Sequence, residues 1–325
     1  MSEAASPPVI GVIGNPRSHG SRGLRGEALR RVAAQAGERV LLREPEDRAA
    51  LRQALSGFAR AGVRVVAVSG GDGTLREVLT ALPAAWQGKA PDIALLPAGK
   101  TDIVAGDVGH SGRGALGLRR LVKALAEGVA LRRVERPVLE VNWPGEATRR
   151  LRGFLFGAAA FAEGHRLANA KLHGNGFFGN AAVGLTVAAM FGRAVLSGQG
   201  TLAHGQEIQV VTDRVARPTG NRFLVLITTL DRLMLGLWPF ADNGKGPVRW
   251  LDIQARPRQL GRALWAVSHR GSNRSWMPAA GYESGLARQV DIQLHHPFVL
   301  DGEVYVPGEK GVTLTAAARQ GFVSV

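Results

Sequence analysis

The stretch of sequence that decides the fold is residues 63–82, VRVVAVSGGDGTLREVLTAL. It opens on an apolar, valine-rich run at 63–68, which is typical of a strand buried in a parallel sheet. The run Gly70-Gly71-Asp72-Gly73-Thr74 follows, and residues 74–82 then have the apolar spacing of a helix. Glycines let the backbone approach a ligand closely, and the N-terminal end of a helix attracts anions. The stretch therefore predicts a strand, an anion-binding turn and a helix in succession.

The same alternation of strand and helix extends on both sides of this stretch. Short apolar runs predict strands at 9–13, 40–42 and 93–96. Apolar residues at helical spacing predict helices at 24–36 and 47–61. Strands in series with helices of this length indicate a parallel sheet with right-handed crossovers.

The second half of the chain changes to a period of two. Apolar and polar residues alternate at 207–210 and 290–295, which predicts half-buried antiparallel strands. Further strands are expected at 223–228, 250–254, 263–268 and 312–314, and helices at 163–172 and 180–196. We predict an α/β N-terminal domain with a parallel sheet at 1–136 and a β-rich antiparallel domain at 137–307, with 308–325 free to return to the first domain.

Two further polar loops follow strands of the predicted parallel sheet. Asn15-Pro16-Arg17-Ser18 comes after the first strand, and residues 97–102, PAGKTD, come after the fourth. In an open parallel sheet the loops at the carboxyl ends of the strands converge on one crevice, where ligands bind. We therefore expect both loops to share a crevice with the turn at 70–74.

Composition excludes several classes of protein. A length of 325 residues suggests two domains, and 45% hydrophobic with 21% charged residues are ordinary globular values. The absence of cysteine excludes disulfides, a thiol nucleophile and thiolate metal sites. No basic segment precedes an apolar stretch at the N-terminus, and no apolar stretch reaches the ~20 residues of a membrane-spanning helix. We expect no targeting segment, and at most a peripheral contact with membranes.

The charge balance is unusual. Forty-one basic and 26 acidic residues give a net charge of +15. Such an excess attracts phosphate-bearing partners, whether nucleic acid, anionic lipid or nucleotide. A bias that spreads arginine over solvated faces explains the same number, because the arginines are scattered and form no tail. Aromatic residues are only 6% of the chain and are not interleaved with the arginines, so specific nucleic-acid binding is not expected.

Taken together, these motifs resemble the diacylglycerol kinase catalytic-domain family, which includes soluble bacterial lipid kinases and the sphingosine and ceramide kinases, and whose fold is related to NAD kinase. The run at 70–74, continued by Leu75-Arg76-Glu77-Val78, is similar to the family's glycine-rich signature. Asn15-Pro16 with Ser18 is similar to its first phosphate loop, and 97–102 lies where the family has a Pro-Gly-Thr-Asn loop. Asp301-Gly302-Glu303 matches its Asp-Gly-Glu element.

The resemblance implies transfer of the γ-phosphoryl group of ATP, with Mg²⁺, to a hydroxyl of a diacylglycerol- or ceramide/sphingoid-type lipid. Asp72 is then the general base or the metal organiser, while Asp301 and Glu303 complete the catalytic site from the second domain, which the lipid enters. The implied cofactor-binding residues are Asn15, Pro16, Ser18, Gly70, Gly71, Gly73, Thr74, Gly99, Lys100 and Thr101. The expected partner is a lipid at an anionic membrane surface, met by a cytoplasmic, peripherally membrane-associated protein. A homodimer is left open.

Three positions depart from the family pattern. Lys100 stands in place of a threonine, while Asp102 and Arg76 each stand in place of an asparagine. Lys100 supplies a charge to a phosphate, or it pairs with Asp102 and marks a site that is retuned or inactive. These two positions leave a non-catalytic lipid- or nucleotide-binding relative as one alternative. A soluble-substrate kinase of the NAD kinase type, which shares the glycine-rich turn, is the other. A loosened P-loop pattern at 94–101 is a weaker reading, because 95–97 resemble the end of a strand and proline has no N–H to offer.

Overall fold

The computed structural model of the chain describes residues 9–15, 18, 23–99, 102–172, 204–233, 236–269 and 271–325. The chain divides into two compact units, residues 1–136 with 319–325 and residues 137–318. It returns to the first unit at Arg319 rather than at residue 308. The reason is that the early part of β16 (Val312–Ser324) pairs with β13 (Gln289–Leu294) in the second unit.

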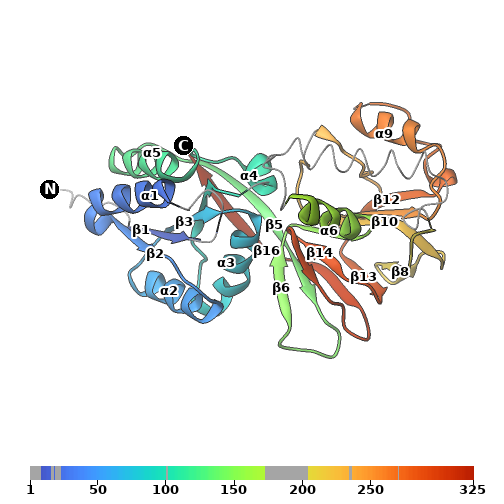
Figure 1. Cartoon of the computed structure of the whole chain (residues 1–325), viewed down its shortest axis with the longest axis horizontal. Coiled ribbons are helices and arrows are strands. Elements are labelled where there is room, and N and C mark those ends of the chain that lie inside the picture. The colour runs from blue at the N-terminus through green and yellow to red at the C-terminus, as the bar shows by residue number, and fades with distance from the viewer. Residues whose placement is uncertain are drawn as a thin grey trace. The chain divides into compact units, whose positions relative to one another are not determined.

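The first unit is a parallel sheet with helices on both faces, as predicted (Figure 1). Its strands run in the order β16-β4-β3-β1-β2, and all neighbours are parallel. Its elements are β1 (Ile10–Gly14), α1 (Leu24–Gln35), β2 (Val40–Arg43), α2 (Arg48–Arg60), β3 (Val65–Gly70), α3 (Asp72–Ala85), β4 (Asp92–Pro97), α4 (Ile103–Val108), α5 (Gly114–Ala126) and the start of β5 (Arg132–Asn142).

Burial on both faces explains why these strands read as continuous apolar runs. Leu29 of α1 and Leu118 of α5 pack into one cluster with the strand residue Val12. On the opposite face the ring of Phe58 in α2 lies so close to β1 that a Cβ on Gly11 would come within 2.5 Å of it. Figure 1 shows α1 and α5 on one side of the strands and α2 and α3 on the other. The carboxyl edge of the sheet is thereby left for loops.

The second unit is β-rich and antiparallel, also as predicted. One run of strands has the order β15-β14-β7-β10-β11-β12, and a second run joins β8, β13 and β16. Its remaining elements are β6 (Arg150–Gly153), β7 (Leu155–Ala159), α6 (Ala160–Leu172), β8 (Gln206–Thr212), β9 (Val215–Ala216), β10 (Asn221–Thr228), β11 (Val248–Gln254), α9 (Leu260–Ser268), β12 (Tyr282–Ala287), β14 (Phe298–Leu300) and β15 (Glu303–Tyr305).

One predicted element is wrong. The expected strand at 263–268 lies in helix α9. Its buried residues include Leu260, Ala263 and Val267, whose spacing of three and four is helical. That period becomes visible only when the segment is read from Leu260, because a six-residue window holds less than two helical turns. The expected helix at 180–196 lies outside the described residues.

Among the helices that the structure describes, none combines the length and the apolar character needed to cross a membrane.

Candidate functional site

The glycine-rich turn joins β3 to α3 within the first unit. Gly70 is the last residue of β3, and Asp72 is the first residue of α3. A Cβ on Gly70 would collide with the side chain of Thr74. The Thr74 hydroxyl in turn accepts a hydrogen bond of 2.9 Å from the Asn15 side-chain amide, in the loop after β1. The glycine thus makes room for a contact that ties the first loop to the start of α3.

The turns after β3 and β4 touch through two glycines. A Cβ on Gly99 would come within 2.7 Å of the Gly71 Cα and within 2.8 Å of Oδ1 of Asp102. A Cβ on Gly71 would lie 3.1 Å from the Gly99 Cα. Two backbones can approach this closely only where neither carries a side chain. The two polar turns are therefore in direct contact, as the expectation of a shared crevice required.

Asp72 holds the start of the next helix. Its Oδ2 accepts a hydrogen bond of 2.9 Å from the amide of Ile103, and its Oδ1 accepts one of 3.3 Å from the amide of Val104. These amides belong to the first turn of α4, where a helix leaves its N–H groups without internal partners. Asp72 therefore links the β3–α3 turn to the segment that follows β4.

Asp102 holds the turn after β4 from within. Its Oδ1 accepts a hydrogen bond of 3.1 Å from the amide of Gly99, and its Oδ2 lies 3.1 Å from Nη2 of Arg113. Arg113 also donates to the Gly99 carbonyl at 3.2 Å. Burial raises the pKa of the Asp102 carboxyl, and Arg113 opposes that rise. The departure from asparagine at this position is thus accompanied by a cation that pairs with the new charge.

Sequence reasoning missed Arg113. It is one of many arginines in the chain and lies in no motif, and its side chain is 65% exposed. Only the fold brings it back onto the turn after β4, so no local pattern could have indicated it.

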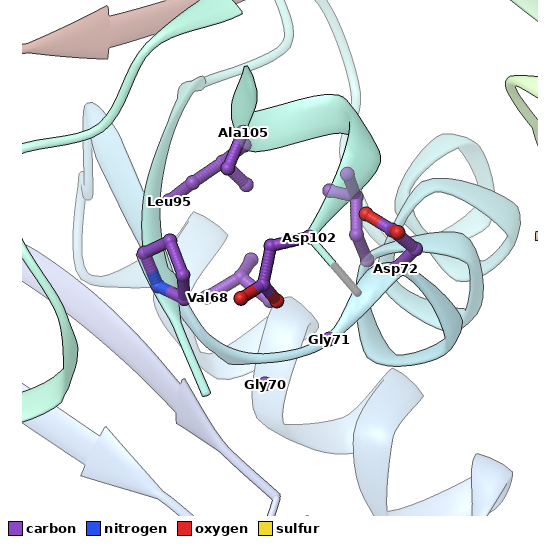
Figure 2. Close-up of a pocket in the computed structure, with 9 residues that line it drawn as sticks. Val68, Gly70, Gly71, Asp72, Leu95, Asp102 and Ala105 are labelled. Atoms are coloured by element: carbon purple, nitrogen blue, oxygen red, sulfur yellow. The ribbon is translucent and has the colours of Figure 1, made fainter. Parts of the chain in front are cut away.

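A hollow opens where these turns meet (Figure 2). It is shallow and open to solvent, and its cavity volume of about 10 Å³ has room for roughly one water molecule. Its lining residues are Val68, Gly70, Gly71, Asp72, Leu75, Leu95, Pro97, Asp102 and Ala105. Figure 2 shows the Asp102 carboxylate pointing into the hollow, whereas the Asp72 carboxylate turns towards the start of α4. The hollow therefore combines apolar strand residues and glycine backbone with the carboxylate of Asp102, and Asp72 lies at its rim (Figure 2).

The structure thus gathers several of the predicted cofactor-binding residues. Asn15, Gly70, Gly71, Thr74 and Gly99 lie in the contacts described above, and the Ser18 amide donates to the Asn15 carbonyl at 3.0 Å. Gly73 lies in the first turn of α3. Pro16, Lys100 and Thr101 lie outside the described residues. The pattern at 94–101 is no P-loop, because β4 extends through Pro97 and is buried there.

Asp301 and Glu303 belong to the hairpin of β14 and β15 in the second unit. Asp301 is only 8% exposed and has a positive φ of 46°. Its carboxylate accepts the amides of Phe154 and Leu155 at 3.0 Å and 2.9 Å. Glu303 is exposed, and its charge opposes the effect of burial, which lowers the pKa of His165. Asp301 therefore anchors the hairpin to the bend before β7, whereas Glu303 projects from it.

The donor set suits a magnesium ion that arrives with a nucleotide. No group of three or more metal-ligating side chains gathers anywhere in the described residues. Two aspartates, Asp72 and Asp102, nevertheless border the hollow, and the Asp102 carboxylate faces it (Figure 2). Mg²⁺ is commonly held by one or two carboxylates together with substrate phosphates and water. The residues present fit that arrangement.

Comparison with known proteins agrees with the motifs. Residues 9–134 match a family model described as the diacylglycerol kinase catalytic domain. The predicted family resemblance is confirmed. Diacylglycerol kinases are lipid kinases, and a kinase family implies the use of ATP. A search of curated proteins gave no match.

Solved structures show the same fold over nearly the whole chain. A diacylglycerol kinase from Bacillus anthracis str. Sterne is 12% identical, with a TM-score of 0.60 over 99% of this chain and 98% of its own. A second structure from that organism is 14% identical, with a TM-score of 0.64 and 99% of both chains covered. A third is 13% identical, with a TM-score of 0.62 and 97% of both chains covered. Identities this low establish a common fold and nothing finer.

Proposed function

We propose that this chain is an ATP-dependent lipid kinase that transfers the γ-phosphoryl group to a hydroxyl of a diacylglycerol- or ceramide/sphingoid-type lipid. The observation that carries the proposal is the contact of three polar turns at the carboxyl edge of the parallel sheet. These turns lie within the residues that match the diacylglycerol kinase catalytic domain.

In this proposal the turns bind the phosphates of ATP. The glycines at 70, 71, 73 and 99 let backbone amides approach phosphate oxygens, and the positive end of α3 adds to the attraction. Asn15, Ser18 and Thr74 supply polar groups from the neighbouring loop and helix start. Lys100 and Thr101 follow Gly99 in the sequence, and Lys100 adds a positive charge. Phosphoryl transfer depends mainly on such positioning and charge neutralisation.

The reaction itself needs a proton acceptor. The lipid oxygen forms a bond to the γ-phosphorus, the bond from that phosphorus to the bridging oxygen breaks, and ADP leaves with the electron pair. The proton of the lipid hydroxyl passes to a carboxylate, for which Asp72, Asp301 and Glu303 are the candidates. Asp72 and Asp301 already accept backbone amides. We therefore assign Asp72 to the metal and the loops.

A magnesium ion bound with the nucleotide would neutralise phosphate charge during transfer. Asp72 and Asp102 are the side chains that would hold it. Asp72 also keeps α4 beside the β3–α3 turn. The same carboxylate would therefore hold both the metal and the start of α4.

The test is a panel of acceptors incubated with ATP, followed by mass spectrometry of the products. The arms are vesicle-borne diacylglycerol, ceramide and sphingosine, with NAD as the soluble acceptor. We expect one of the lipids to gain a phosphoryl group. Phosphorylation of NAD alone would replace the proposal with the soluble-substrate alternative.

A matched pair of variants tests the role of Asp72. Asp72→Asn removes the charge and keeps the size, and we expect turnover to fall by about 10²-fold or more. Asp47→Asn is the control, because the Asp47 carboxylate also accepts a helix amide, that of Ala50 at 2.8 Å, on α2. Asparagine caps helices as well as aspartate does, so Asp47→Asn should leave turnover unchanged.

A second candidate function is a non-catalytic nucleotide-binding relative. The observation in its favour is that Asp72 and Asp102 both serve internal contacts, to α4 and to Arg113. Such a protein would bind ATP without phosphorylating any acceptor of the panel, and Asp72→Asn would have no turnover to remove.

A further inference from the structure

Helix α9 presents an exposed tryptophan on the outside of the second unit. Trp265 is 58% exposed, although large aromatic side chains are usually mostly buried. The helix is nonetheless firmly seated, because Leu260, Ala263 and Val267 pack into a buried cluster with residues of β10, β11 and β12. Figure 1 shows α9, in orange, at the periphery of its own unit. The exposure of Trp265 is therefore a property of a packed helix and not of a loose segment.

The chain around α9 carries positive charge and no negative charge. Between Asp252 and Glu283 there is no acidic residue, whereas Arg256, Arg258, Arg262, Arg270 and Arg274 all fall in this interval. Arg270 lies outside the described residues. Within the described part of the chain, none of the other four pairs with a carboxylate. Arg217, Arg222 and Arg249 of the same unit all do. Arg256, Arg258 and Arg262 are exposed and thus available to an external anion, whereas Arg274 donates to the carbonyls of Trp238 and Ala266.

Ring contacts hold this surface in place. The guanidinium of Arg262 lies 4.3 Å from the centroid of the Trp276 ring. The ring of His269 stacks on Trp265 at 4.6 Å with an interplanar angle of 21°. Arg262 and Trp265 lie three residues apart on α9, Arg258 precedes the helix, and His269 follows it; all four are exposed. We call these four residues the α9 face.

We propose that the α9 face docks this protein on an anionic lipid bilayer. An indole ring settles at the interface of a bilayer, and arginines beside it reach lipid phosphates at the same depth. The lack of any carboxylate in the surrounding segment removes the repulsion that an anionic surface would meet. The choice of a lipid surface over another polyanion rests on the proposed function, whose acceptor resides in a bilayer.

The experiment is sedimentation of the full chain with vesicles. Phosphatidylcholine vesicles are compared with vesicles in which part of the lipid is phosphatidylglycerol. The wild type should bind the anionic vesicles, and added salt should weaken that binding. The double variant Arg258→Gln/Arg262→Gln should bind about fivefold more weakly for each arginine removed. The charge-matched control is Arg25→Gln/Arg31→Gln on α1, where both arginines are also exposed, and it should bind as the wild type does.

Trp265 is tested in the same assay. Trp265→Ala should weaken binding to anionic vesicles, whereas Leu116→Ala, which removes another exposed apolar side chain, should not. Vesicles made with brominated lipid should quench the fluorescence of the wild type more than that of Trp265→Phe, because the Trp265 indole lies at the depth of the lipid.

Three outcomes would overturn the proposal. One is equal loss in the two double variants, which would mean that net charge alone attracts the protein. Another is no loss in either. The third is unchanged vesicle binding together with loss of oligonucleotide binding in the α9 variants, which would make nucleic acid the partner. Vesicle binding needs no ATP and no turnover. If the protein binds vesicles through α9 but phosphorylates no acceptor, the proposed function is wrong and this inference still holds.

Discussion

Aspartates in the two units hold the fold by the same kind of contact in very different surroundings. In the first unit, Asp72 and Asp102 accept backbone amides at the edge of a hollow that is open to solvent. In the second unit, Asp301 accepts two amides and Asp252 pairs with Arg222, at exposures of only 8% and 3%. Water can replace a lost hydrogen-bond partner at Asp72 or Asp102, but not at Asp301 or Asp252. Substitution of the first two aspartates should therefore reduce activity, and substitution of the other two should reduce stability.

The largest effect on stability is expected from the buried ion pair. Nε of Arg222 lies 2.7 Å from Asp252, and both side chains are almost fully buried. Arg222→Ala leaves a buried carboxylate without its cation, so it should destabilise the protein by about 3–5 kcal/mol in urea denaturation. Arg166→Ala is the control, because the Arg166 side chain is 68% exposed in its pair with Glu163. That variant should change stability by no more than about 1 kcal/mol. Similar losses for the two would remove the distinction between the units.

A smaller effect is expected at the hairpin turn. Asp301→Ala leaves the buried amides of Phe154 and Leu155 without acceptors and should cost about 2–3 kcal/mol. Asp301→Asn keeps one accepting oxygen and suits the positive φ of 46°, so it should cost clearly less. Melting temperatures of the two variants measure the difference. If they were equal, the amide contacts would not be what holds this turn.

Stability should also depend on pH through Asp252. Burial raises the pKa of this carboxyl from 3.8 to about 6, although Arg222 opposes the rise. Because the folded state holds the proton more tightly than the unfolded state, this contribution to stability is complete below about pH 4. It is lost as the pH rises through about 6, by on the order of 1–3 kcal/mol. The urea midpoint of the wild type should fall as the pH is raised from 4 to 7, and that of Asp252→Asn should change less over the same range. Parallel curves would contradict the assignment to Asp252.

The smallest effect on stability is expected at the hollow itself. Asp72→Asn should change the free energy of unfolding by less than about 1 kcal/mol, because asparagine keeps one accepting oxygen and Asp72 borders a hollow that is open to solvent. The same variant is expected to lose most turnover. A large loss of stability in Asp72→Asn would mean that Asp72, like Asp252 and Asp301, mainly stabilises the fold.

Local patterns were enough to predict most of the fold. The predicted strand at 63–68 and the helix after it are found as β3 and α3. Both could be predicted because the apolar pattern of a short segment reflects which of its residues are buried. The same is true of the alternating strands of the second unit. The prediction of a strand at 263–268 was wrong, because a short apolar run has no unambiguous period.

The contacts that complete the site could not be predicted in this way. Asp72 meets Ile103 and Val104 across 31 and 32 residues, and Asp301 meets Leu155 across 146. Arg113 and its pairing with Asp102 depend likewise on how loops return over the sheet. Glycines could be recognised as points of close approach, but the sequence does not say which backbone approaches which. Only the assembled sheet pairs Gly71 with Gly99.

The most direct test of the central claim is the affinity for ATP, measured by calorimetry. We predict that the protein binds ATP more tightly than adenosine. Gly99→Ala, whose Cβ would meet the Gly71 backbone, should weaken ATP binding by about tenfold or more. Gly57→Ala, with nothing within 4 Å of the added Cβ, should bind ATP as the wild type does. If ATP binds no better than adenosine, or if the two glycine variants bind it equally, these turns do not hold the phosphates.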